Sequence, residues 1–382
     1  MGAKKEIPRA ALEAALAGSA RSTPQLAAAR SFVEGLQAED TSVIGAFVHG
    51  SAARGDSLDD SDVDLHIVVE GEPPAPAAFW RDGVVLDVMY ISTDMMTVDP
   101  RDFLDSEEGR EELARGHLLW DIVDSIVIFD PDGLTRGYKR VAATLARDPE
   151  LLKLRAGFIL EDSVATLGEA RDAFAEDSLK GFTLLYRAPG PAVRGGAAPV
   201  AMQALLAMGS RPMGFRSIFP QFRVAAEDFG YLELVGYAQA AWGLSTVSVA
   251  GADSAFELMT RIYDSGVKAV EAAREQGMAE EAAASEPYMS KDERDRAIAL
   301  AKSLVDSGEV HGAIAFAVGK ALQVLSLDKF PNPWLKADRG KPEDVIRKGI
   351  EKILGSPSTE ETAARMDALD TIQWTLAELL SG

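Results

Sequence analysis

The sequence predicts an α+β protein in which a mixed sheet flanked by helices is followed by a large all-helical part. Two observations lead to this prediction. Short apolar runs rich in β-branched residues alternate with helical patterns up to about residue 140, and strand patterns nearly vanish beyond it. The chain has 382 residues, of which 47% are hydrophobic, enough for two or three domains. We therefore expect two domains, at residues 1–140 and 141–382.

The first part begins with a helical pattern from Pro24 to about Gln37. A second helical pattern covers about Glu107–Leu119. Four apolar runs, each bounded by Gly, Pro or Asp residues, are typical of strands. They lie at Val43–His49, Asp62–Val69, Val84–Ile91 and Ser125–Phe129. In the second run, Asp62, Asp64 and His66 alternate with apolar residues, so one face of that strand is polar and the other belongs to the core.

The second part shows only long amphipathic or Ala-rich patterns that are typical of helices. These patterns cover about residues 149–176, 253–276, 291–326 and 358–380. We find no internal repeat. No apolar run reaches the roughly 18 residues of a membrane span, so we expect a cytoplasmic protein.

The composition excludes several kinds of site. With no cysteine, the chain has no disulfides, thiolate nucleophiles or cysteine zinc sites. The four histidines, at positions 49, 66, 117 and 311, are too scattered along the chain to suggest a multi-histidine site. Carboxylates are abundant, and these hard oxygen ligands favour Mg²⁺. The net charge of −21 disfavours a nucleic acid held through many phosphate contacts and favours a cationic or neutral small molecule, or a nucleotide with its metal.

One segment brings together residue types that suit phosphate chemistry. Gly50 and Ser51 end a strand and open a short helix, so backbone N–H groups and the Ser51 hydroxyl can hold an anion. Asp62 and Asp64 lie two residues apart on a strand, so both carboxylates project from one face, about 6.5 Å apart along the chain. A divalent cation relieves their repulsion, and Asp87 adds a third carboxylate if its strand lies alongside. This pattern predicts phosphoryl or nucleotidyl transfer with one or two metal ions.

The spacing of these residues resembles the signature of the DNA polymerase β-like nucleotidyltransferase superfamily. Gly50-Ser51 is followed by ten residues, then by Asp62-Val63-Asp64-Leu65 and the later strand residue Asp87. The stretch GSAARGDSLDDSDVDL is similar to the bacterial branch that includes aminoglycoside and lincosamide nucleotidyltransferases and the minimal nucleotidyltransferases of toxin–antitoxin pairs. The resemblance covers about residues 25–133. His66 departs from it, since many members have an apolar residue at that position.

The resemblance implies roles for individual residues. Ser51 would contact the β- and γ-phosphates of a nucleoside triphosphate, and Gly50 would let the backbone approach them. Asp62 and Asp64 would hold one or two Mg²⁺ ions, and Asp87 would complete the metal site or act as general base. Arg54 is the nearest basic residue in sequence that can neutralise the phosphates. Four further basic residues remain open as phosphate contacts: Lys139, Arg140, Lys153 and Lys180.

The expected activity is that of an Mg²⁺-dependent nucleotidyltransferase, a transferase that moves a nucleoside monophosphate onto a hydroxyl group of a small acceptor and releases pyrophosphate. The donor would be ATP or another nucleoside triphosphate. By resemblance, the acceptor would be an aminoglycoside-like antibiotic, so the enzyme would confer antibiotic resistance. Residues 1–140 would then be the catalytic domain and 141–382 the domain that binds the acceptor.

Other interpretations remain open at this point. The acceptor can be a macromolecule, a tRNA end or a protein, as in toxin-like members, or the chain can be a catalytically idle module that binds a nucleotide or a partner. Asp62 and Asp64 can belong to a solvated Asp-rich loop, and Asp87 can face solvent at a sheet edge. Arg54 can form an ion pair that fixes a loop. Five aromatic residues of the second part can stack a nucleobase but are more typical of a core: Tyr186, Phe215, Phe219, Phe222 and Trp242.

Overall fold

The computed structural model divides into two compact units, Met1–Leu151 and Leu152–Gly382. The first unit holds a sheet with helices, and the second is mostly helical, so the α+β prediction is confirmed. The structure describes residues 23–55, 57, 62–176, 178–189, 195–211, 213–245, 249–277, 289–325, 348–350, 352–353 and 359–381.

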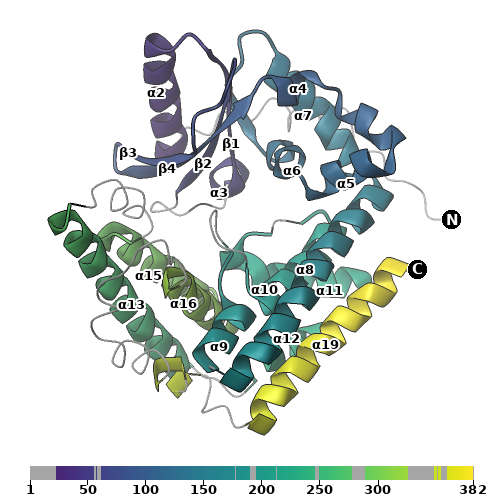
Figure 1. The fold of residues 1–382 in the computed structure, drawn as a ribbon, viewed down its shortest axis with the longest axis vertical. Helices are drawn as coiled ribbons and strands as arrows, with labels where there is room; N and C mark the ends of the chain where they lie inside the picture. The colour runs from purple at the N-terminus through teal and green to yellow at the C-terminus, as the bar shows by residue number, and fades with distance from the viewer. Residues whose placement is uncertain are drawn as a thin grey trace. The chain divides into compact units, whose positions relative to one another are not determined.

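The sheet of the first unit has five strands in the order β3-β4-β2-β1-β5 (Figure 1). The strands are β1 Val43–His49, β2 Val63–Val69, β3 Ala77–Arg81, β4 Val84–Ser92 and β5 Ile126–Phe129. β1 pairs antiparallel with both β2 and β5, and β3 pairs antiparallel with β4. β2 and β4 are parallel. The sheet is therefore mixed, as predicted, with β2 at its centre.

One strand, β3, was not predicted. It is a short edge strand that follows a stretch with prolines at 73, 74 and 76, which is typical of a loop. A tight turn joins it to β4 through Asp82 and Gly83, whose φ angles of 51° and 79° are both positive. A turn of this kind matches the twist of two antiparallel strands and fixes their register.

The helices of the first unit lie on both faces of the sheet. They are α2 Pro24–Glu39, α3 Gly50–Arg54, α4 Asp94–Thr97, η1 Pro100–Asp105, α5 Glu107–Arg115, α6 His117–Val123 and α7 Leu134–Leu145. The single helix predicted over about Glu107–Leu119 is in fact two, α5 and α6, because the chain is extended at Gly116 between them. α2 covers one face of the sheet, and α6 and α7 pack against the other (Figure 1).

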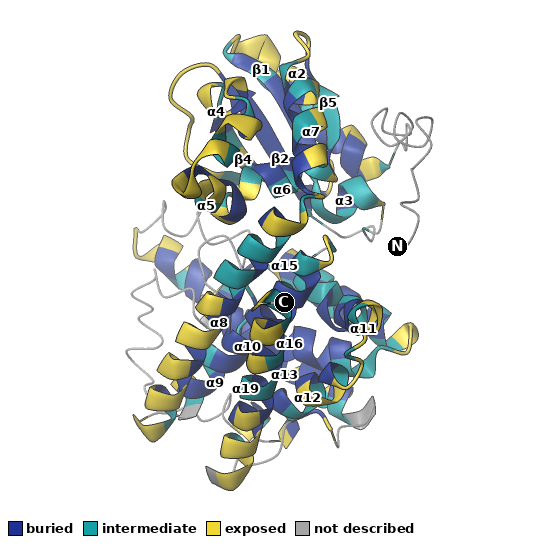
Figure 2. Cartoon of the chain, turned by 90° about the vertical axis from the view of Figure 1, so that its right-hand side faces the viewer, coloured by how far each residue is buried: buried dark blue, intermediate teal, exposed yellow. Residues whose placement is uncertain are grey.

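The core of the first unit lies between α2 and the sheet. Apolar side chains of α2, such as Leu26 and Val33, form one cluster with Val48, Leu65 and Leu86, each at most 2% exposed. In Figure 2 this burial appears as the dark blue of β1 and β2. Because successive side chains of a strand point to opposite faces, the residues next to these apolar ones project from the face opposite α2.

The described helices of the second unit are α8 Pro149–Glu176, which starts just before the unit boundary, α9 Ser178–Tyr186, α10 Ala197–Met208, η2 Phe215–Ser217, α11 Ile218–Phe229, α12 Leu234–Ala241, α13 Val249–Glu275, α15 Lys291–Asp306, α16 Val310–Leu325 and α19 Thr359–Ser381. The helix predicted at 291–326 is divided into α15 and α16 near Gly308, whose φ is 85°. None of the helices in the described part of the chain is both long and apolar enough to cross a membrane.

The aromatic residues of the second unit form part of its core. Tyr186 and Trp242 stack with ring centroids 4.9 Å apart, and each is at most 1% exposed. Phe219 packs against the edge of Trp242, and the Tyr186 hydroxyl donates a hydrogen bond to the carbonyl of Ala241 at 2.8 Å. Phe222 is fully buried, while Phe215 is half-buried with its ring 6.3 Å from that of Trp242. These contacts favour the core interpretation over nucleobase stacking.

Candidate active site

The register of two parallel strands places Asp64 beside Asp87. Asp64 of β2 is the direct partner of Asp87 in β4. Neighbouring strands lie about 4.8 Å apart, and paired residues point to the same face, so the two side chains project together from the face opposite α2. Both are half-buried, as is Asp62, which directly precedes β2. This partial burial favours a site over a fully solvated Asp-rich loop or a solvent-facing sheet edge.

The turn from β1 into α3 lies against the carboxylate of Asp64. Gly50, the first residue of α3, has a φ of 68°. A Cβ built on Gly50 would lie 2.0 Å from Oδ2 of Asp64, closer than any real contact. Only glycine fits here, so the Gly50-Ser51 turn and the carboxylate of Asp64 come together. The helix is held by a hydrogen bond from the Gly55 N–H to the Ser51 carbonyl at 2.9 Å.

Arg54, the last residue of α3, is half-buried. The pKa of His49 is lowered mainly by burial, and the positive charge of Arg54 lowers it further, although Asp121 opposes both effects. The guanidinium of Arg54 is therefore close enough to His49 to act on it electrostatically. This places positive charge near the end of β1, where the Gly50-Ser51 turn begins.

The other basic candidates lie in different surroundings. Lys139 of α7 is buried, and its ammonium donates a hydrogen bond to the Ser125 carbonyl. Burial lowers the pKa of Lys139, with Asp124 acting in the opposite direction. Lys139 therefore fastens α7 to the residue before β5, which makes it a poor candidate for a phosphate contact. Arg140 and Lys180 are exposed, and Lys153 is half-buried.

Two histidines that sequence reasoning treated as scattered lie side by side on the same sheet face. In the pairing of β1 with β2, His49 is the partner of Asp64 and Phe47 is the partner of His66. The rings of His49 and His66 have centroids 4.5 Å apart. Burial lowers the pKa of His66 to about 3. A prediction that these two strands pair antiparallel would have placed the two histidines near each other.

The donor set on this face suits a hard divalent cation. Asp62, Asp64 and Asp87 supply carboxylate oxygens, the ligands that Mg²⁺ prefers. The space beside Gly50, which a Cβ would fill, is taken by the carboxylate of Asp64. These carboxylates are the residues that would hold Mg²⁺ together with the phosphates of a substrate.

Comparison with known families gives a match over part of the first unit. Residues 29–132 match the model of a family described as nucleotidyltransferase domain. The matched segment begins within α2 and ends in the turn after β5, so it includes all five strands and the Gly50-Ser51 turn. A search of curated proteins finds no match. The family match over residues 29–132 supports nucleotidyl transfer from a nucleoside triphosphate in general.

Proposed function

We propose that the protein is an Mg²⁺-dependent nucleotidyltransferase that moves AMP from ATP onto a hydroxyl group of a small molecule. One observation carries this proposal. Asp64 and Asp87 are register neighbours on one sheet face, and the carboxylate of Asp64 abuts the Gly50 turn, all within the segment that matches the nucleotidyltransferase domain family.

Each residue of the site has a proposed task. Asp62, Asp64 and Asp87 would hold one or two Mg²⁺ ions, which supply charge neutralisation for the triphosphate and activate the acceptor hydroxyl. Ser51 would donate a hydrogen bond to the β- or γ-phosphate, and the lack of a Cβ at Gly50 lets this turn lie against the carboxylate of Asp64. The guanidinium of Arg54 would offset phosphate charge.

The proposed reaction is a displacement at the α-phosphorus. The oxygen of the acceptor hydroxyl forms a bond to the α-phosphorus, and the bond from this phosphorus to the oxygen bridging to the β-phosphate breaks. Pyrophosphate leaves with the electron pair of the broken bond. The hydroxyl proton passes to a base, and Asp87 is the proposed acceptor of that proton.

The proposed acceptor is an aminoglycoside-like antibiotic, so the biological role would be antibiotic resistance. The net charge of −21 favours a polycationic acceptor and disfavours RNA, since like charges repel. Residues 1–140 would form the catalytic domain and residues 141–382 the acceptor-binding domain. The exposed carboxylates Glu161 and Asp162 on α8 add to the negative charge of that second part.

The test is pyrophosphate release from each of the four nucleoside triphosphates with Mg²⁺, with and without a panel of aminoglycosides and lincosamides. Asp64→Asn and Asp87→Asn preserve side-chain size while removing the charge. Asp132→Asn is the matched control, since Asp132 is exposed in the turn after β5. We expect acceptor-dependent release with the wild-type chain and the control, and at least a hundredfold loss in both site variants.

The other outcomes separate the alternatives. Release that requires tRNA or a protein in place of the antibiotics would replace the small acceptor by a macromolecule. Tight ATP binding without release under any condition would indicate an idle nucleotide-binding module. Full turnover in both Asp64→Asn and Asp87→Asn would overturn the assignment of the site.

A further inference from the structure

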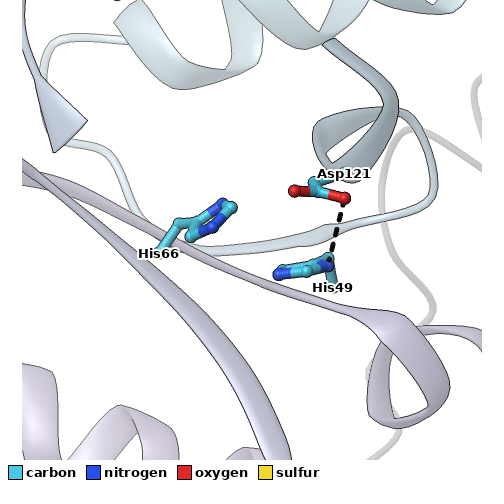
Figure 3. Close-up of side chains that lie close together, drawn as sticks. All are labelled: His49, His66 and Asp121. Atoms are coloured by element: carbon cyan, nitrogen blue, oxygen red, sulfur yellow. Dashed lines mark ion pairs between the residues drawn. The ribbon is translucent and has the colours of Figure 1, made fainter. Parts of the chain in front are cut away.

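Three side chains of metal-ligating type meet on the sheet face opposite α2, and they come from three different elements. His49 ends β1, His66 lies in β2, and Asp121 belongs to α6. One ligand atom from each lies within 4.8 Å of the others. Nδ1 of His49 is 3.7 Å from Oδ1 of Asp121. Figure 3 shows the carboxylate of Asp121 near both imidazole rings.

The second observation is a buried nitrogen without a partner. His66 is only 3% exposed, and among the residues that the structure describes its Nδ1 has no hydrogen-bond partner. The ring of Phe47 packs edge-on against the His66 ring at a centroid distance of 4.9 Å and offers no hydrogen bond. A buried polar atom without a partner is unfavourable and calls for an explanation, one of which is an ion that the protein binds.

We propose that His49, His66 and Asp121 bind one divalent transition-metal ion of the Zn²⁺ class. Two imidazole nitrogens and one carboxylate oxygen form a typical three-residue zinc set, whereas Mg²⁺ prefers oxygen ligands alone. Metal–ligand bonds of about 2.0–2.2 Å in a tetrahedron place the ligand atoms about 3.4 Å apart. The His49–Asp121 distance of 3.7 Å is close to this value, and all three ligand atoms lie within 4.8 Å of one another. The fourth position is left to water or another ligand.

The ion would join α6 to β1, which ends at the Gly50-Ser51 turn, and to β2, which carries Asp64. His49 is the register partner of Asp64 and directly precedes Gly50, so an ion bound to His49 fixes the end of β1 at that turn. Asp121 contributes the only ligand of the three that lies outside the sheet. The proposed role of the ion is therefore structural positioning, and the inference stands on these three residues whether or not the proposed transfer reaction is correct.

The experiment is Zn²⁺ binding to the full chain after removal of metals with a chelator. A chromophoric chelator competes for Zn²⁺ while excess Mg²⁺ occupies the carboxylate site. We expect one Zn²⁺ per chain, and binding at least about tenfold weaker in His49→Ala and in Asp121→Ala. Co²⁺ in place of Zn²⁺ should give the visible absorption of a four-coordinate nitrogen and oxygen site, which both variants lose.

Two control variants make the outcome specific. His311→Asn changes a half-buried histidine of the second unit that contacts Gln239, and it should bind Zn²⁺ like the wild type. The double variant Asp64→Asn/Asp87→Asn should also keep the Zn²⁺ stoichiometry. Circular dichroism confirms that each variant is folded. His49 and Asp121 are the ligands chosen for substitution because half-buried side chains can be replaced with less disturbance of the fold. The proposal is overturned if the wild type binds no stoichiometric Zn²⁺, or if binding survives in both ligand variants or disappears in the double variant.

Discussion

The carboxylate of Asp64 lies so close to Gly50 that a Cβ at residue 50 would meet its Oδ2 at 2.0 Å. Gly50 also has a φ of 68°, in the left-handed region that residues with a Cβ rarely adopt. Glycine is thus needed at this position for two independent reasons, the backbone conformation and the space that Asp64 occupies.

Gly50→Ala should therefore displace Asp64 as well as strain the backbone. The left-handed conformation alone costs about 1–2 kcal/mol for a residue with a Cβ. A displacement of about 1 Å at a reacting centre lowers a rate by roughly a hundredfold. We expect pyrophosphate release to fall by about that factor, and urea unfolding to show a loss of at least about 1 kcal/mol.

Gly133→Ala is the matched control for this prediction. Gly133 has a φ of 76°, but a Cβ there meets nothing within 4 Å. This variant should lose stability through backbone strain and keep its transfer rate. Equal rates in the two alanine variants would show that the contact between Gly50 and Asp64 has no effect on activity.

The parts of the site that depend on strand patterns could be predicted from the sequence. The apolar, β-branched run Val43–His49 and the alternation of polar and apolar residues from Asp62 to Val69 predicted β1 and β2 within one residue, because both patterns are typical of strands. The neighbourhood of Asp64 and Asp87 was predicted only on the condition that their strands lie alongside. The parallel pairing of β2 with β4 meets that condition.

Features that depend on tertiary packing could not be predicted from the sequence. Asp121 reaches His49 because α6 packs on the sheet, and no local pattern connects residues so far apart in the chain. The burial of Lys139 depends in the same way on where α7 lies. β3 was not predicted because the prolines before it are typical of a loop. Its pairing with β4 outweighs this local preference in the folded chain.

Asp130→Ala should destabilise the first unit. The Asp130 side chain is fully buried and accepts hydrogen bonds from the backbone N–H groups of Thr135 at 3.1 Å and Arg136 at 3.0 Å, at the start of α7. Loss of these bonds leaves the two N–H groups in the first turn of α7 without this acceptor and lowers the free energy of unfolding by about 1–2 kcal/mol. Urea unfolding measures the loss, with the exposed Asp132→Ala in the same turn expected to stay within about 0.5 kcal/mol of the wild type. Equal effects at the two positions would contradict this role of Asp130.

Lys139 should make stability depend on alkaline pH. Its pKa is lowered in the folded protein, chiefly by burial, so the unfolded chain holds the proton more tightly. Above the ordinary pKa of 10.5, Lys139 is neutral in both states and the folded protein gains stability relative to the state with a charged ammonium. This gain is lost as the pH falls through the lowered pKa and the buried ammonium becomes charged. We therefore expect the unfolding free energy of the wild type minus that of Lys139→Met to rise with pH. The contributions of all other titrating groups are common to both proteins and cancel in this difference. A difference that stays constant across this range would refute the prediction.

Mg²⁺ should stabilise the folded chain through the carboxylates of the candidate site. An ion that binds only the folded state stabilises it by about 2.7 kcal/mol at a concentration of one hundred times its Kd. We expect the Tm of the wild type to rise with Mg²⁺ concentration and the rise to shrink strongly in Asp64→Asn, because one of two adjacent carboxylates has lost its charge. Asp132→Asn should retain the full shift. The titration is run with a chelator selective for transition metals, so that occupancy of the His49, His66 and Asp121 group does not contribute. A Tm shift that is the same in Asp64→Asn as in the wild type would place the Mg²⁺ ion elsewhere.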